Sequence, residues 1–178
     1  MGTDSLDIVL LHCPPMQTYY DPEMFATLDA LKAEGKIKHY GVSVERVEEA
    51  IKAMDYGVSV VEIIFNMFRL RPAELFFKLA KEHNVGILAR VPLASGLLSG
   101  KMTVDTKFAP TDQRTNNRHG ELFDKGETFS GVDFLTGVAA ANELKERLHT
   151  ENLAGTALRY ILMYAAVSAV IPGASNPK

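Results

Sequence analysis

The sequence has little of several features that would mark a specialised protein. It contains one cysteine, so no disulfide can form within the chain, as suits a reducing compartment. No apolar run approaches the ~20 residues that span a bilayer, and the N-terminus lacks a signal-peptide pattern. The net charge of −3 gives no excess of basic side chains for nucleic acid or an anionic membrane. We therefore expect a cytoplasmic protein with neither nucleic acid nor membrane as its partner.

Two classes of site motif are also missing. The five histidines and the single cysteine show no spacing typical of metal ligands, so no metal site is expected. No predicted strand leads into a Gly-x-Gly-x-x-Gly turn, which removes the strongest signal for a dinucleotide-binding sheet of the Rossmann type.

What the sequence does contain is an alternation of short apolar runs with amphipathic segments. The hydrophobic fraction of 47% is enough for a packed core. The runs predicted to be strands are 7–12, 37–44, 58–65, 86–92 and 168–172. Helices are predicted after Pro22, from Val47, from Pro72 and across Leu153 to Tyr164.

This alternation indicates an α/β protein built from parallel βαβ units with the helices outside. An open doubly wound sheet and a (β/α)₈ barrel both have this pattern. Without the Rossmann turn the barrel is favoured, but five strands are too few to close it, because such barrels usually take about 250 residues. We therefore predict a partial (β/α)₈ barrel, with residues 1–178 as a single domain.

Residues 99–131 break the pattern with a polar, turn-rich stretch. Loops longer than ~12–15 residues in compact domains are usually functional lids or disordered linkers. Because this stretch follows a predicted strand, it is expected on the C-terminal rim, where barrel active sites lie. A mobile insertion without a role is the alternative.

Several segments, in this order, resemble the aldo-keto reductases. The resemblance is carried by residues 2–12, 34–37 with 41–43, 61–66, 90–101 and 170–174. They are similar to the fourth to eighth strands of the family barrel and the turns that follow them. The resemblance implies reduction of aldehydes or ketones to alcohols, with a small carbonyl compound as the substrate and NADP(H) rather than NAD(H) as the cofactor.

His12 matches the family's active-site histidine, which helps to position the substrate carbonyl. An imidazole at a strand end on the open rim can donate a hydrogen bond to a substrate oxygen. On composition alone, a core histidine that caps a strand is the plainer interpretation. Cys13 should not form a dyad with His12, because neighbouring strand residues point to opposite faces.

Three further residues match positions around the nicotinamide. Ser43 matches the serine that binds the carboxamide, although a turn serine bonding local backbone is the alternative. Glu62 stands where the family commonly has glutamine. Arg90 stands where the family often has a tyrosine stacked on the ring. A guanidinium can also stack on an aromatic plane, and an interior ion pair is the alternative role for Arg90.

The remaining candidates match the phosphate-binding part of the cradle. Leu93, Ser95 and Leu97 match the loop that passes the pyrophosphate, and Gly173 and Ala174 begin what resembles the adenosine-phosphate segment. An ordinary tight turn after a buried strand is the alternative for all five. Basic residues of the long loop could meet phosphates, but charged loop residues are usually only solvated. These are Lys101, Arg114 and Arg118.

The family's Asp-x-Ala-x-x-Tyr element and its strand-borne lysine have no match in the sequence. Tyr19 and Tyr20 follow His12 but lack the required context. We therefore expect no turnover from this chain alone, and self-association through open barrel edges. The leading hypothesis is part of a reductase. The alternatives are a cofactor-binding regulatory subunit of the same fold with little turnover, a truncated inactive product, or a different (β/α) enzyme.

Overall fold

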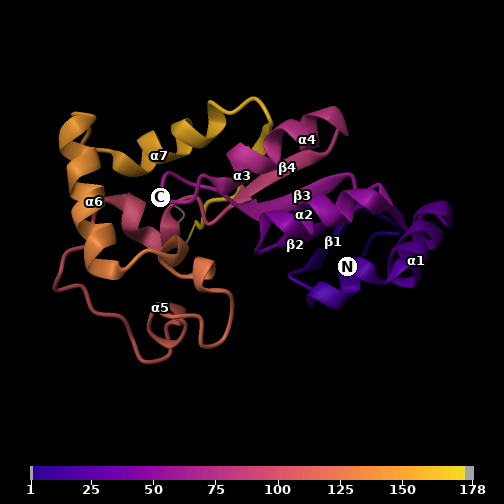
Figure 1. The fold of residues 1–178 in the computed structure, drawn as a ribbon, viewed down its shortest axis with the longest axis horizontal. Coiled ribbons are helices and arrows are strands. Elements are labelled where there is room, and N and C mark those ends of the chain that lie inside the picture. Colours follow the sequence, from indigo (N-terminus) through magenta and orange to yellow (C-terminus); the bar gives the residue numbers. More distant parts are fainter. Residues whose placement is uncertain (1, 175–178) are drawn as a thin grey trace. The chain divides into compact units, whose positions relative to one another are not determined.

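The computed structural model describes residues 2–174, and in it strands alternate with helices along the chain (Figure 1). The strands are β1 (Leu6–His12), β2 (Ile37–Val44), β3 (Val60–Ile64), β4 (Gly86–Arg90) and β5 (Val167–Val170). The α-helices are α1 (Pro22–Ala33), α2 (Val47–Ala53), α3 (Arg71–Leu75), α4 (Phe77–Glu82), α5 (Gln113–Asn116), α6 (Phe134–Arg147) and α7 (Leu153–Leu162). The predicted α/β class is confirmed.

The strands form a five-stranded sheet in the order β1-β2-β3-β4-β5. β1 pairs with β2 in parallel, and β2 pairs with β3 in parallel. A sheet in which chain neighbours are also spatial neighbours is what right-handed βαβ crossovers produce. This agrees with the predicted succession of βαβ units.

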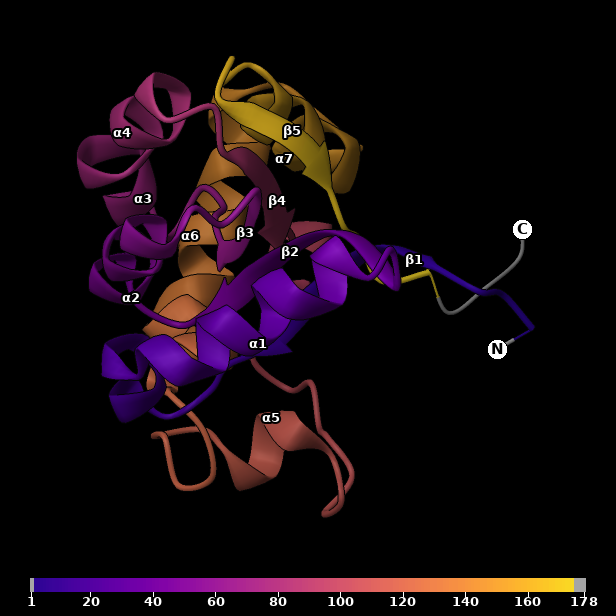
Figure 2. The ribbon, with the colours of Figure 1, turned by 90° about the vertical axis from the view of Figure 1, so that its right-hand side faces the viewer.

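Two compact units make up the chain. The first comprises Met1–Ile63 and Arg71–Leu88, and the second comprises Ile64–Leu70 and Ala89–Lys178. In the first unit, α1 and α2 both pack against β2 (Figure 2). β2 is buried on both faces from Tyr40 to Val44, as expected for a strand inside a parallel sheet.

The ends of the elements follow from local backbone geometry. Gly35 and Gly57 take the left-handed conformation after α1 and after the turn that follows α2, with φ of 72° and 69°. β4 ends at Arg90, two residues earlier than predicted, because Val91 has a φ of 50° and leaves the extended region. α6 was not among the predicted helices.

The second unit has its own core, which joins the turn after β4 to α6 and α7. Leu97, Leu98, Phe129 and Leu153 are at most 1% exposed in this cluster. α6 approaches closely because Gly137 has no side chain: a Cβ there would lie 2.5 Å from Leu97 Cδ1. Within residues 2–174, no helix is long and apolar enough to cross a membrane.

The predicted long loop contains short helical turns. α5 lies within it, and 3₁₀ turns follow at Lys125–Glu127 and Phe129–Gly131. Asn117 is fully buried, and its Oδ1 accepts hydrogen bonds from Leu122 N and Phe123 N at 2.8 and 2.7 Å. These bonds give residues 117–123 a defined conformation.

β1 is an edge strand among the described residues. Although its sequence is apolar, it is partly open to solvent, and Ile8 is 45% exposed. Long apolar edges favour pairing with another chain, and a lysine on the edge opposes it. We propose that the isolated chain associates with a second copy through the β1 edge.

Multi-angle light scattering after gel filtration tests this proposal. We expect the 178-residue chain to elute above monomer mass, and Ile8→Lys to shift it towards the monomer. Leu75→Lys serves as a matched control, because Leu75 is 44% exposed on α3 and lies away from the edge. A monodisperse wild-type monomer would contradict the proposal.

Candidate active site and cofactor cradle

Three candidate residues of the first unit lie in one row across the sheet. The strand register pairs His12 with Ser43 and Ser43 with Glu62. Residues opposite each other in this way project from the same face of a sheet. The row lies towards the carboxyl ends of the parallel strands, which is where (β/α)₈ enzymes place their chemistry. The structure therefore brings these three candidates together.

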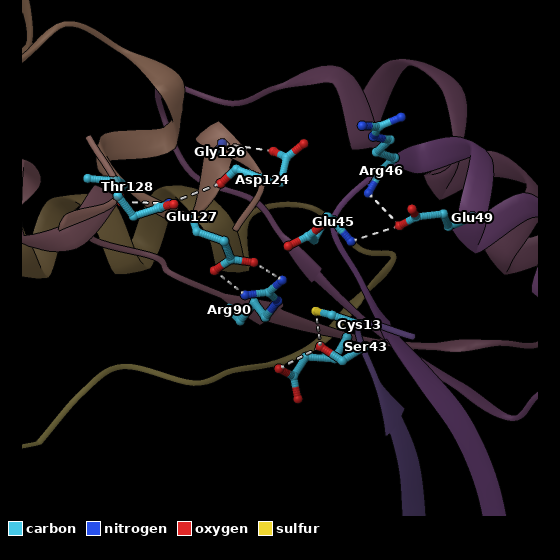
Figure 3. Close-up of polar contacts among 12 residues, drawn as sticks. Cys13, Ser43, Glu45, Arg46, Glu49, Arg90, Asp124, Gly126, Glu127 and Thr128 are labelled. Atoms are coloured by element: carbon cyan, nitrogen blue, oxygen red, sulfur yellow. Dashed lines mark hydrogen bonds and ion pairs between the residues drawn. The ribbon is translucent and has the colours of Figure 1, made fainter. Parts of the chain in front are cut away.

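Hydrogen bonds link part of this row. Ser43 is fully buried, and its Oγ donates to Glu62 Oε1 at 3.2 Å. The Cys13 Sγ lies 3.9 Å from the same Oγ (Figure 3). With the Ser43 proton directed at Glu62, the thiol is the donor in the second contact. The result is a chain from thiol through hydroxyl to carboxylate.

The position of Cys13 differs from the simple strand alternation. Its φ is 43°, so the strand geometry ends at His12 and the side chain turns towards Ser43. The backbone N–H of Cys13 donates to Ser43 O at 2.9 Å, which holds this turn. Sequence reasoning missed the contact because it assumed strand alternation beyond the strand end.

The turn that follows β2 is held by a buried carboxylate. Glu49 is 7% exposed, and its Oε2 accepts hydrogen bonds from the backbone N–H groups of Glu45 and Arg46 at 3.0 Å each (Figure 3). This satisfies donors at the start of α2 that would otherwise lack partners. The arrangement fixes the direction in which the chain leaves Ser43.

Tyr19 is not placed to act as a proton donor. Its side chain is fully buried, and burial, with the nearby Glu49 carboxylate, raises its pKa well above the usual range. A buried phenol with a raised pKa is a poor acid. The sequence interpretation that Tyr19 does not replace the family's tyrosine agrees with this geometry.

In the second unit, Arg90 forms an ion pair. Its guanidinium is bidentate to the Glu127 carboxylate, with Nη1 donating to Oε2 at 2.7 Å and Nη2 donating to Oε1 (Figure 3). The two side chains are 10% and 13% exposed. Of the two roles open for Arg90, the structure shows the interior ion pair, and its stacking on a cofactor ring stays a prediction.

Ser95, in the turn after β4, forms hydrogen bonds with the loop segment that contains Glu127. Its Oγ donates to Glu127 O at 3.1 Å and accepts from Phe129 N at 3.0 Å. The turn itself is left-handed at Ser95 and Gly96, with φ of 55° and 103°. Leu93 is half-buried there, whereas the side chain of Leu97 is in the core. Leu97 could thus meet a ligand only through its backbone.

Two of the basic residues of the loop, Arg114 and Arg118, have structural partners. Arg114 is paired with Asp112 at 2.7 Å, which lowers the pKa of Asp112 to about 2, and its guanidinium lies 4.4 Å from the centre of the Phe108 ring. The Arg118 guanidinium lies against the rings of Phe108, Phe129 and Phe134. These contacts give both arginines a packing role that their loop position did not suggest.

A cavity of about 330 Å³ lies beside these groups in the second unit, lined by Val91, Ser95, Asp112, Gln113, Arg114, Glu127 and Thr128. Gly173 and Ala174 follow β5 as exposed chain, and a Cβ at Gly173 would meet no atom within 4 Å. They are not among the residues that line this cavity.

The donors and acceptors of the first unit suit a nicotinamide carboxamide. Such a group has one C=O acceptor and two N–H donors. The Ser43 hydroxyl can turn from Glu62 to donate to the C=O, and the Glu62 carboxylate can accept an N–H. The hydrogen-bonding groups of Ser43 and Glu62 are therefore complementary to those of a carboxamide.

Comparison with known proteins decides the family. The model of the aldo/keto reductase family matches residues 1–178, the whole length of the chain. The chain belongs to the aldo/keto reductase family. The family resemblance of the five sequence segments is thereby confirmed.

This aldo/keto reductase chain is similar to several named proteins and solved structures. The uncharacterized oxidoreductase YqkF of Bacillus subtilis (strain 168) is 30% identical, and the match covers 99% of the chain and 53% of YqkF. The NADH-specific methylglyoxal reductase of Escherichia coli (strain K12) is 25% identical over 65% of the chain and 36% of its own length. The holo form of the aldo-keto reductase AKR11C1 from Bacillus halodurans has a TM-score of 0.74 at 25% identity, covering 98% of the chain and 50% of that protein.

The chain spans about half the length of YqkF and of that solved structure. The solved neighbours are (β/α)₈ barrels, and the chain corresponds to part of them. This confirms the prediction of a partial barrel.

Proposed function

We propose that this chain carries the histidine and part of the cofactor cradle of an NAD(P)H-dependent reductase that converts aldehydes or ketones to alcohols. The row of His12, Ser43 and Glu62, which lies towards the carboxyl ends of three parallel strands, is the observation that carries the proposal. The substrate is a small carbonyl compound, and the compartment is the cytoplasm.

The roles of the residues follow from their chemistry. A bound nicotinamide cofactor would supply the hydride. His12 is exposed at the end of β1, where its imidazole can donate a hydrogen bond to the carbonyl oxygen and orient it. Ser43 and Glu62 hold the carboxamide and so set the position of the nicotinamide ring. The turn from Leu93 to Leu97 passes the pyrophosphate, and Gly173 and Ala174 begin the adenosine-phosphate segment.

The cofactor is proposed to be NADP(H) rather than NAD(H). The names of the relatives differ on this point, since one is an NADH-specific methylglyoxal reductase and another, from Saccharomyces cerevisiae, is an NADPH-dependent alpha-keto amide reductase. Fluorescence titrations with NADPH and NADH decide it. We expect the dissociation constant for NADPH to be the lower, and equal constants would contradict this part of the proposal.

The enzymatic role is tested by adding back the missing catalytic elements. We expect the chain alone to show no carbonyl-dependent NADPH oxidation, because no segment matches the family's tyrosine and lysine elements. Joined to the first three strands of a family barrel, it should oxidise NADPH when a test aldehyde is added. Cofactor binding without turnover would favour the regulatory subunit, and failure to fold or bind would favour an inactive product.

A further inference from the structure

Glu62 places a carboxylate directly beside the serine that the proposed function assigns to the carboxamide. Ser43 and Glu62 are register partners on β2 and β3, and the hydroxyl donates to the carboxylate at 3.2 Å. Glu62 is partly buried, whereas Ser43 is fully buried. The charge is therefore held at a defined place by the sheet and is incompletely screened by water.

The two forms of a nicotinamide cofactor differ in charge at the ring. The oxidised ring carries a positive charge, and the reduced ring is neutral. A nearby carboxylate attracts the oxidised form and has no comparable attraction for the reduced form. A glutamine at the same position could make the same hydrogen bonds without this charge.

We propose that Glu62 makes this site discriminate between the oxidation states of its cofactor, so that it holds NADP⁺ more tightly relative to NADPH than a neutral residue would. The inference rests on the proposed function, because it requires the carboxamide to lie at Ser43 and Glu62. It adds that the bound cofactor is shifted towards its oxidised form. By thermodynamic linkage, hydride transfer from the bound cofactor to the carbonyl is then more favourable than it would be with a neutral residue at this position.

The first consequence is a measurable ratio of dissociation constants. In the whole protein, Glu62→Gln should lower the ratio of the NADPH constant to the NADP⁺ constant about tenfold, which corresponds to about 1.4 kcal/mol. Most of the change should come from weaker NADP⁺ binding. NADPH binding is followed by its own fluorescence, and NADP⁺ binding by competition; the chain contributes no tryptophan background.

Glu48→Gln is the matched control. It makes the same change of charge on α2, where Glu48 pairs with Arg71 and is 56% exposed. Its ratio should stay within about twofold of the wild type, because exposed charges are screened. Thermal melts of both variants check that the fold is retained.

The outcomes separate the two proposals. A tenfold fall in the ratio with Glu62→Gln supports the inference. If the variant changes both constants by one factor, or neither, Glu62 acts only through hydrogen bonds and the inference is overturned while the proposed function stands. If the wild-type protein binds neither form, the cofactor part of the proposed function fails, and the inference fails with it.

Discussion

Replacing Arg90 with alanine should lower the free energy of unfolding by about 3–5 kcal/mol. Arg90 and Glu127 are bidentate partners with side chains only 10% and 13% exposed. Removing the guanidinium leaves the Glu127 carboxylate with little access to water, and burying a charge without compensation is costly. The 3₁₀ turn Lys125–Glu127 should loosen as well, because the ion pair and Ser95 both hold it. Urea denaturation and hydrogen exchange at Glu127 and Phe129 measure the two effects.

Two controls separate the ion pair from a general loss of packing. The double variant Arg90→Met with Glu127→Leu removes both charges at similar volume, so its stability should lie much nearer to that of the wild type. Arg147→Ala breaks the exposed pair with Glu143, whose side chains are 75% and 60% exposed, and should cost less than about 0.5 kcal/mol. If Arg90→Ala costs no more than Arg147→Ala, the ion pair does not hold the loop.

The second large effect is expected at Gly41. It lies in β2 between Leu10 of β1 and Val60 of β3, and an ideal Cβ there would be 1.9 Å from the carbonyl oxygen of Val60. The obstructing atom is backbone, so relief requires a shift of β2 against β3. Overpacking of this kind costs about 3 kcal/mol or more when a strand must move.

The Gly41→Ala variant should therefore unfold at a lower urea concentration than the wild type. Circular dichroism measures this transition. Gly173→Ala is the control, because a Cβ at Gly173 would meet no atom within 4 Å, and its stability should stay within about 0.5 kcal/mol of the wild type. The shift should also separate Ser43 from Glu62, so weaker cofactor binding is expected at temperatures where the variant is folded. Equal stabilities of the two variants would contradict the β2–β3 contact.

The strands were predictable from sequence to within a few residues, because buried parallel strands are short apolar runs bounded by turn residues. β2 agrees with its predicted range, while β4 is shorter because Val91 takes a left-handed φ that a β-branched residue does not suggest. α6 was missed because its helical stripe is weak and follows a long polar stretch. The burial of α6 depends on the contact between Gly137 and Leu97, and no local sequence pattern predicts this contact.

The candidate site was predictable only at residues that match positions of the family pattern. His12, Ser43 and Glu62 were identified by their order along the chain, and the strand register places them in one row. Glu127 was missed: a buried Arg90 demands an acidic partner, but the long loop offers several acidic residues and no signal ranks them. Which carboxylate meets the guanidinium depends on how the loop folds back, which is a tertiary property.

Hydride transfer by the whole barrel tests most directly whether this chain is part of a working reductase. The chain, joined to the first three strands of a family barrel, is assayed for NADPH oxidation with an aldehyde, alongside its His12→Ala variant. We expect turnover in the first protein and a fall in kcat/KM of about 100-fold or more in the second, because His12 orients the carbonyl. Equal turnover by the two proteins would contradict the role of His12. Cofactor binding with no turnover in either would contradict the assignment of this site to a reductase.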